Sequence, residues 1–147
     1  DRLVEMLQLD HELLPNAREY QAAAARTGVP MLFRSHSIDW DETERIIKAL
    51  LNLMPVLPFE VTHAFVVLGI DGNLGSMERA VNQAMVAQLT DPGVQADEEK
   101  LIRFCISISY LGPSESVNPL VKLMNNDKRM RVRNAARHAL QNMGYSL

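Results

Sequence analysis

The sequence predicts an all-α protein. Its 147 residues are 47% hydrophobic and 22% charged, a balance ordinary for a folded globular chain. Leu, Ala, Met, Glu and Gln are frequent whereas aromatic residues make up only 5%, and this composition favours helix over strand. In most segments apolar residues recur at every third to fourth position, which is the spacing of one face of a helix.

Four glycines follow apolar helical runs and divide the chain: Gly28, Gly69, Gly112 and Gly144. Glycine adopts the left-handed conformation that often ends a helix, so each of the four is predicted to be a helix C-cap. They are separated by 41, 43 and 32 residues, intervals close to the length of a two-helix repeat. We therefore expect about four helix pairs, arranged as a short right-handed α-solenoid within a single domain over 1–147.

The expected helices follow from the apolar runs and from their start signals. Pro15 and Pro58 are tolerated at the first position of a helix. Asp39 and Glu42 form a start that resembles a capping box. The predicted pairs are 2–9 with 15–26, 40–54 with 58–68, 77–89 with 97–111, and 117–125 with 128–143.

The segment 101–111 is apolar nearly all round and is expected to be central in the stack. A strand is the alternative there, because Ile106, Ile108 and Tyr110 alternate with serines. The acidic residues before the segment suit a helix N-terminus, and the glycine after it suits a C-cap, so helix is favoured.

The C-terminal segment 116–144 forms a complete two-helix unit, with a short apolar helix, a polar turn, an Ala-rich helix and a final glycine. Its characteristic residues are Asp127, Val132, Arg133, Ala135, Ala136, Ala139, Leu140 and Gly144. On these residues the segment resembles the short HEAT-like repeat found in bilin lyases, and the earlier segments match that pattern less well. The resemblance implies a solenoid, and it implies that Asp127 and Arg133 act as a structural pair. An irregular helical bundle is the alternative.

Charge is unevenly distributed along the chain. The net charge is −3, but residues 113–147 carry six Lys or Arg against two Asp or Glu, whereas residues 1–112 carry a net −7. Four arginines lie in this basic part: Arg129, Arg131, Arg133 and Arg137. We expect them to bind an acidic partner, so that the chain serves as a non-catalytic protein–protein interaction or scaffold module. A merely solvated helix face is the alternative.

Nucleic acid is a less favoured partner. Some HEAT-like proteins, including alkylpurine DNA glycosylases, bind DNA with basic helices. Such binding depends on a broad positive surface, because neutralised phosphates supply most of the affinity. Here most of the chain is acidic, and its basic residues are not interleaved with aromatic ones.

No catalytic, cofactor or metal residues are predicted. The four histidines, His11, His36, His63 and His138, are too dispersed for a local metal motif. The pair His11-Glu12 resembles those with which HEAT-type hydroxylases hold two irons, but it occurs only once. Nothing marks a tetrapyrrole pocket, so bilin-lyase and iron-enzyme activities remain minor alternatives.

Three further features bear on location and structure. No apolar run reaches the ~18 residues of a membrane span, and we expect a cytoplasmic protein. Because the chain begins at Asp1 rather than Met, we expect it to be part of a longer protein. Cys105 is expected to be buried, Trp40 is expected to anchor the core, and the glycine-rich segment 69–75 is read as a turn.

Overall fold

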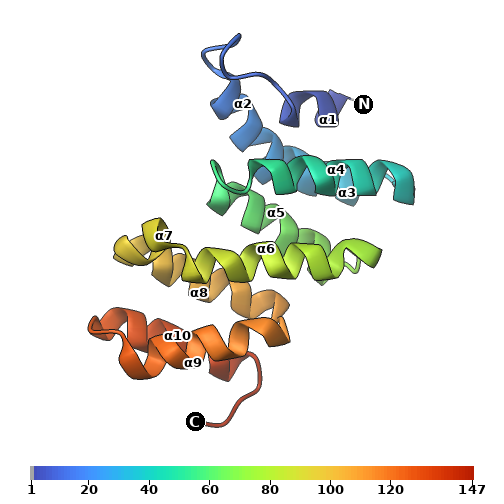
Figure 1. Ribbon diagram of the computed structural model, residues 1–147. Helices are drawn as coiled ribbons and strands as arrows, with labels where there is room; N and C mark the ends of the chain where they lie inside the picture. Colours follow the sequence, from blue (N-terminus) through green and yellow to red (C-terminus); the bar gives the residue numbers. More distant parts are fainter. Residues whose placement is uncertain (1) are drawn as a thin grey trace. The chain divides into compact units, whose positions relative to one another are not determined.

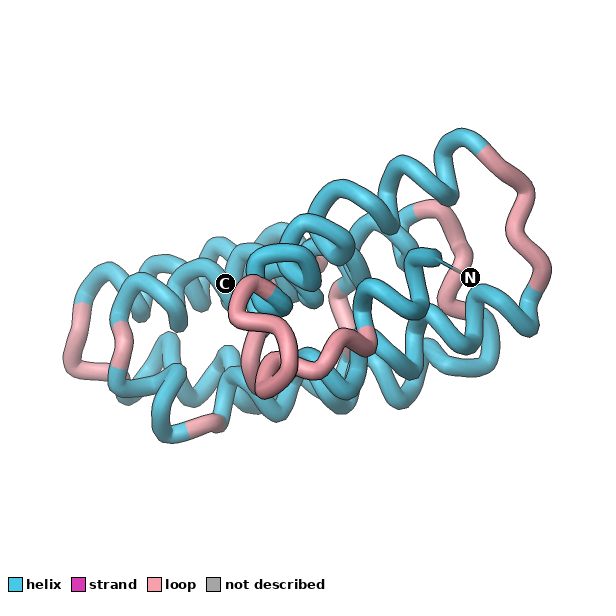
Figure 2. Tube along the Cα trace, turned by 90° about the horizontal axis from the view of Figure 1, so that it is seen from above, coloured by secondary structure: helices cyan, strands magenta, loops and turns pink. Residues whose placement is uncertain are grey.

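The structure is a computed structural model that describes residues 2–147 and is all-α (Figure 1). It is 77% helical, and no strand occurs among the described residues, so helices make up most of the trace in Figure 2. The fold class predicted from composition and periodicity is therefore confirmed. In chain order the helices are α1 (Arg2–Leu7), α2 (Ala17–Ala23), α3 (Val29–Ser35), α4 (Trp40–Leu53), α5 (Pro58–Ile70), α6 (Glu78–Thr90), α7 (Pro92–Ala96), α8 (Glu98–Leu111), α9 (Val117–Asn126) and α10 (Met130–Asn142).

The chain divides into two compact units. The first extends to Val81 and the second runs from Asn82 to Leu147, so the division falls within α6. The second unit contains all four predicted partner-binding arginines.

The core of the first unit lies between α1, α4 and α5. On α4 the buried stripe includes Ile46, Ile47 and Leu50, which are fully shielded from solvent. On α5 the corresponding residues are Phe65 and Leu68. Helix α1 packs on α4, while α5 packs against α3 and the turn that precedes α3. The burial of these large side chains is the main source of stability of the unit.

The helix expected to end at Gly28 instead continues. A π-helical turn over Ala24–Gly28 joins α2 directly to α3, and the φ of Gly28 is −63°, an ordinary helical value. The prediction of a C-cap was wrong because glycine also accepts helical angles, and because the apolar pattern extends through the buried Val29 and Pro30. Pro30 has no N–H to donate, and a locally widened turn accommodates such a residue within a helix.

Gly28 has a packing role in place of the predicted capping role. A Cβ atom at this position would lie 3.1 Å from Cδ1 of Leu3, so the absence of a side chain allows α1 to approach the π-helical turn closely. Glycine is therefore favoured at position 28 by the close contact between α1 and the π-helical turn, and not by a helix C-cap.

The second incorrect cap is Gly69, which lies inside α5. The helix ends at Ile70, and Gly72, two residues beyond, has a φ of 75°. The amide of Gly72 donates to the carbonyl of Gly69 (3.1 Å), and the amide of Asn73 donates to that of Leu68 (2.8 Å). These two bonds form the Schellman arrangement that satisfies the last carbonyls of a helix. Within the glycine-rich segment 69–75, residues 71–74 form the predicted turn, whereas Gly69 and Ile70 belong to α5.

Helix α4 begins as its sequence predicts. The carboxylate of Asp39 accepts a hydrogen bond from the amide of Glu42 at 2.8 Å. The next residue, Trp40, remains 37% exposed, so it is only partly the core anchor expected. Its ring lies over Gly75, where a Cβ atom would come within 2.6 Å of Trp40 Cζ3. Gly75 has a φ of 51°, so both its backbone conformation and its neighbour require glycine.

The core of the second unit lies between α8, α9 and α10. Helix α10 packs against both α8 and α9. Fully buried side chains from the three helices include Leu101, Leu120 and Val132. Phe104 of α8 is also buried. The segment 101–111 is helical, so the strand alternative is wrong and the favoured prediction is confirmed.

The two C-terminal glycine caps are also confirmed. Gly112 has a φ of 59°, and its amide donates to Ile108 at 2.9 Å. Gly144 has a φ of 98° and follows α10, where the amide of Tyr145 donates to Leu140 at 3.1 Å. Both glycines relieve the strain that a side chain would cause in the left-handed region.

Candidate partner-binding face

The turn between α9 and α10 is organised by a carboxylate. Asp127 accepts hydrogen bonds from the backbone amide of Arg129 (2.9 Å) and from the Nε and Nη2 atoms of the same residue (both 3.0 Å). The hydrogen bonds from Arg129 hold the pKa of Asp127 below its usual range. Arg129 is therefore committed to closing the turn.

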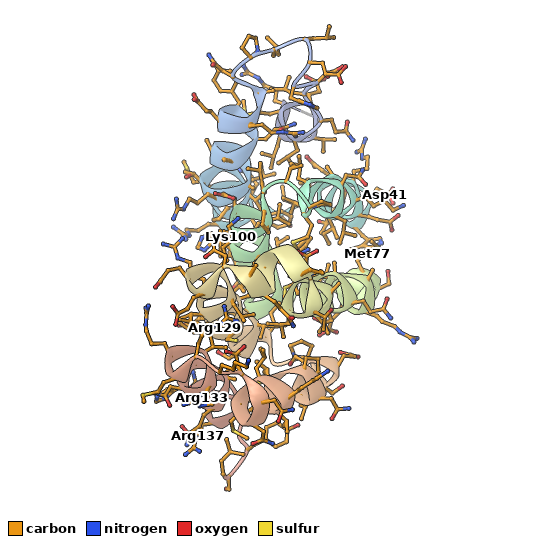
Figure 3. All side chains as sticks on the ribbon, turned by 60° about the vertical axis from the view of Figure 1, so that its left-hand side comes forward. Asp41, Met77, Lys100, Arg129, Arg133 and Arg137 are labelled. Carbon is orange, nitrogen blue, oxygen red and sulfur yellow. The ribbon has the colours of Figure 1, made fainter. Side chains whose placement is uncertain are left out.

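Arg133 is used in the same turn but in another way. Its Nη1 atom donates to the backbone carbonyls of Asp127 (2.9 Å) and Lys128 (3.0 Å). The structural use expected for Arg133 is thus present, while the carboxylate partner expected for it is taken by Arg129. Figure 3 labels Arg129, Arg133 and Arg137, which follow one another at intervals of four residues. An arginine on the first full turn of α10 thereby fixes the chain that leads into this helix.

Arg131 joins α10 to α8. Its Nη1 atom lies 2.5 Å from Oε1 of Glu99, and the two side chains remain 62% and 64% exposed. An ion pair this exposed contributes little to stability, because water and salt compete with it. A carboxylate from another molecule can therefore replace Glu99 at low cost.

Of the four arginines, Arg137 makes the fewest interactions within the described residues. It lies on the exposed side of α10, and within residues 2–147 its guanidinium takes part in no hydrogen bond or ion pair. Its charge is available to a partner without the loss of any internal contact. The structure therefore divides the predicted site into two structural arginines, Arg129 and Arg133, and two accessible ones, Arg131 and Arg137.

Helix α8 contributes an apolar part that sequence reasoning missed. Ile106 is 45% exposed and Tyr110 is 63% exposed, and Glu99 and Arg103 are exposed on the same helix. The positions 99, 103, 106 and 110 have the spacing of one helix face. The opposite face is buried and includes Phe104. The exposed stripe was detectable as this repeat, but the apolar character of the whole segment concealed it. We call the exposed surfaces of α8 and α10 together the α8–α10 face.

Cys105 lies on the buried side of α8. Burial, with a smaller effect from the charge of Asp127, raises the pKa of its thiol to about 12. The thiol is therefore protonated at neutral pH and is no nucleophile. The prediction of a buried small side chain is confirmed.

A depression of about 350 Å³ lies beside α9 in the second unit. Asp127 at its edge is an ionised carboxylate engaged by Arg129, so it is not a proton donor at neutral pH. The lining residues are Leu89, Thr90, Gln95, Pro119, Lys122, Leu123, Asn126 and Asp127.

The residues considered from the sequence as metal ligands do not come together in the described part of the chain. His11 accepts a hydrogen bond from Arg18 (3.1 Å) on an exposed surface, and Glu12 donates its amide to Asp10. Over residues 2–147 no three His, Cys, Asp or Glu side chains come together as metal ligands would. In the same range no helix is both long and apolar enough to cross a bilayer.

Comparisons with protein-family models, with curated proteins and with solved structures found no match for the chain. The resemblance to HEAT-like repeats therefore rests on the residues of the C-terminal helix pair.

Proposed function

We propose that the chain is a non-catalytic protein-binding module that holds an acidic protein partner against the α8–α10 face. The observation that carries this proposal is the division among the arginines. Arg131 is held only by an exposed ion pair and Arg137 by none, and both project from the helix that also carries the basic excess of the C-terminal part. An arginine whose charge is not neutralised by contacts within the chain can bind an acidic partner.

The proposal includes the HEAT-like architecture, with α9 and α10 as one unit of a short right-handed solenoid in a single domain over 1–147. The ion pair between Glu99 and Arg131 supports it, because the two residues are 32 positions apart and each lies in the first turn of its helix. The capping glycines Gly112 and Gly144 are separated by the same interval. Equivalent positions in two successive helices are what a repeat produces.

The test is a comparison of proteins captured by the immobilised chain from nuclease-treated lysate of the source organism. The variant Arg131→Glu/Arg137→Glu reverses the two accessible charges. The matched control Arg34→Glu/Arg79→Glu reverses two exposed arginines of the first unit. We expect acidic proteins retained by the parent chain and by the control to be lost by the first variant, and their capture to weaken as salt rises.

Two outcomes would contradict the proposal. Identical captures by all three proteins would show that the α8–α10 face does not bind the partner. In lysate without nuclease, retention of nucleic acid in place of protein would replace the proposed partner with the alternative one.

A further inference from the structure

The α8–α10 face combines an apolar centre with basic surroundings. Ile106 and Tyr110 lie four residues apart on α8, which places them about 6 Å apart along the helix axis. Both are substantially exposed although each is a large apolar or aromatic side chain. Aromatic side chains with this exposure are typical anchors at protein interfaces.

The charges around this centre define the partner's composition. Arg103 lies on the same stripe of α8, and Arg131 of the neighbouring helix α10 reaches this stripe through its ion pair with Glu99. The opposing charges are those of Glu99 and of Glu98, which also acts on Arg131. A partner surface that complements this pattern has apolar residues at its centre and carboxylates beside them.

The backbone of the face limits the shape of the partner. The amides and carbonyls within α8 and α10 bond to each other inside the helices, so an extended segment would find no sheet edge with which to pair. A helix satisfies its own backbone and docks through side chains alone. From Glu99 to Tyr110 the stripe measures about 17 Å, or roughly three helical turns.

We infer that the α8–α10 face binds an acidic amphipathic helix of another protein, whose apolar stripe covers Ile106 and Tyr110 and whose carboxylates pair with Arg131. This inference rests on the proposed function and specifies its partner. Two apolar residues one turn apart on the bound helix match the spacing of Ile106 and Tyr110. The carboxylates on its flanks displace Glu99 from Arg131.

The experiment measures fluorescence anisotropy of labelled peptides added to the full chain. The first probe is a peptide of about 18 residues composed of Glu, Ala and Leu, with leucine at every third to fourth position. The second probe has the same composition with the leucines scrambled, which removes the apolar face while keeping the charge.

The variant Ile106→Gln/Tyr110→Gln removes the apolar centre without changing charge. The matched control, Ile70→Gln/Tyr20→Gln, replaces the same residue types at exposed positions of the first unit. Because all four side chains are exposed, each variant should keep the circular dichroism spectrum and thermal midpoint of the parent chain. We expect the amphipathic peptide to bind the parent chain and the control about tenfold more tightly than it binds the first variant. We also expect it to bind the parent chain about tenfold more tightly than the scrambled peptide does.

Equal binding of the two peptides, or unchanged binding by Ile106→Gln/Tyr110→Gln, would overturn the inference. So would the absence of binding by the amphipathic peptide at concentrations up to about 1 mM. The charge-reversal variant Arg131→Glu/Arg137→Glu tells a failure of this inference apart from a failure of the proposed function. If Arg131→Glu/Arg137→Glu abolishes binding of both peptides while the apolar variant has no effect, the basic site stands and the helical partner is wrong.

Discussion

The turn between α4 and α5 and the turn between α9 and α10 connect helix pairs by different chemistry. In the first, the amide of Leu57 donates to the carbonyl of Leu53 (2.8 Å), and Pro58 starts the next helix. In the second, Asp127 binds Arg129, and Arg133 binds the backbone of the turn. Backbone bonds and a proline perform in the first unit what charged side chains perform in the second.

This difference accounts for why the resemblance that we propose to a HEAT-like repeat is confined to the C-terminal helix pair. A turn closed by backbone bonds leaves few side-chain requirements, so many sequences can form it. A turn closed by Asp127, Arg129 and Arg133 requires particular residues at particular positions. The second kind of turn therefore leaves more of a pattern in the sequence than the first.

The largest expected effect comes from one glycine in each unit. Gly75→Ala would place a Cβ atom 2.6 Å from the ring of Trp40, at a φ of 51°, whereas Gly112→Ala at a similar φ of 59° would meet its nearest atom at 3.5 Å. We expect a loss of about 3 kcal/mol for Gly75→Ala and about 1 kcal/mol for Gly112→Ala, because only the first adds a clash to the backbone strain. Urea unfolding measures both, and equal losses would show that the Trp40 ring yields freely.

The next largest loss of stability is expected for substitutions in the α9–α10 and α4–α5 turns. Asp127→Ala removes the acceptor of three hydrogen bonds, and we expect a loss of about 2 kcal/mol. Pro55→Ala in the α4–α5 turn changes mainly the freedom of the unfolded chain, and we expect a loss of about 0.5 kcal/mol. The free energies of unfolding in urea test this order. A greater loss for Pro55→Ala would refute the distinction between the turns.

Acid should affect the charged turn selectively. The folded-state pKa of Asp127 lies below its unfolded value of about 4, chiefly through its hydrogen bonds with Arg129. The stability that Asp127 contributes is therefore complete above about pH 4 and is lost as the pH falls through the folded-state pKa. Thermal unfolding of the parent chain and of Asp127→Asn across this range should show a shallower acid dependence for the variant. Curves of identical slope would contradict the ionic origin of this turn.

The smallest effect concerns the ion pair on the proposed binding face. Glu99→Gln frees Arg131 from its exposed partner. We expect no measurable change in thermal midpoint, and about a threefold gain in affinity for an acidic peptide. The isosteric substitution keeps the size of the side chain. A loss of affinity would show that Glu99 contributes to binding instead of competing with it.

Much of the fold could be predicted from local sequence. Asp39 and Gly112 are terminal signals whose effect depends on a few neighbouring residues, and both have the predicted role. Gly28 failed as a signal because the same residue serves close packing as well as capping. Its contact with Leu3 links positions 25 residues apart, and no local pattern contains that information.

The candidate site was only partly predictable, for a related reason. The sequence identifies α10 as basic, but it does not tell which of its arginines are engaged in contacts within the chain. Arg133 reaches the backbone of the preceding turn, and Arg131 reaches a residue 32 positions away. The exposure of Tyr110 depends likewise on which sides of α8 its neighbours cover. These are tertiary contacts, so the accessible part of the site becomes visible only in three dimensions.

The central claim is tested most directly by mapping the bound peptide on the chain with amide ¹H–¹⁵N chemical shifts. A titration with the acidic amphipathic peptide should shift the amides around Ile106 and Tyr110 on α8 and around Arg131 on α10, while those of α4 remain in place. Shifts confined to the first unit, or to the depression lined by Lys122, would contradict the assignment of the α8–α10 face.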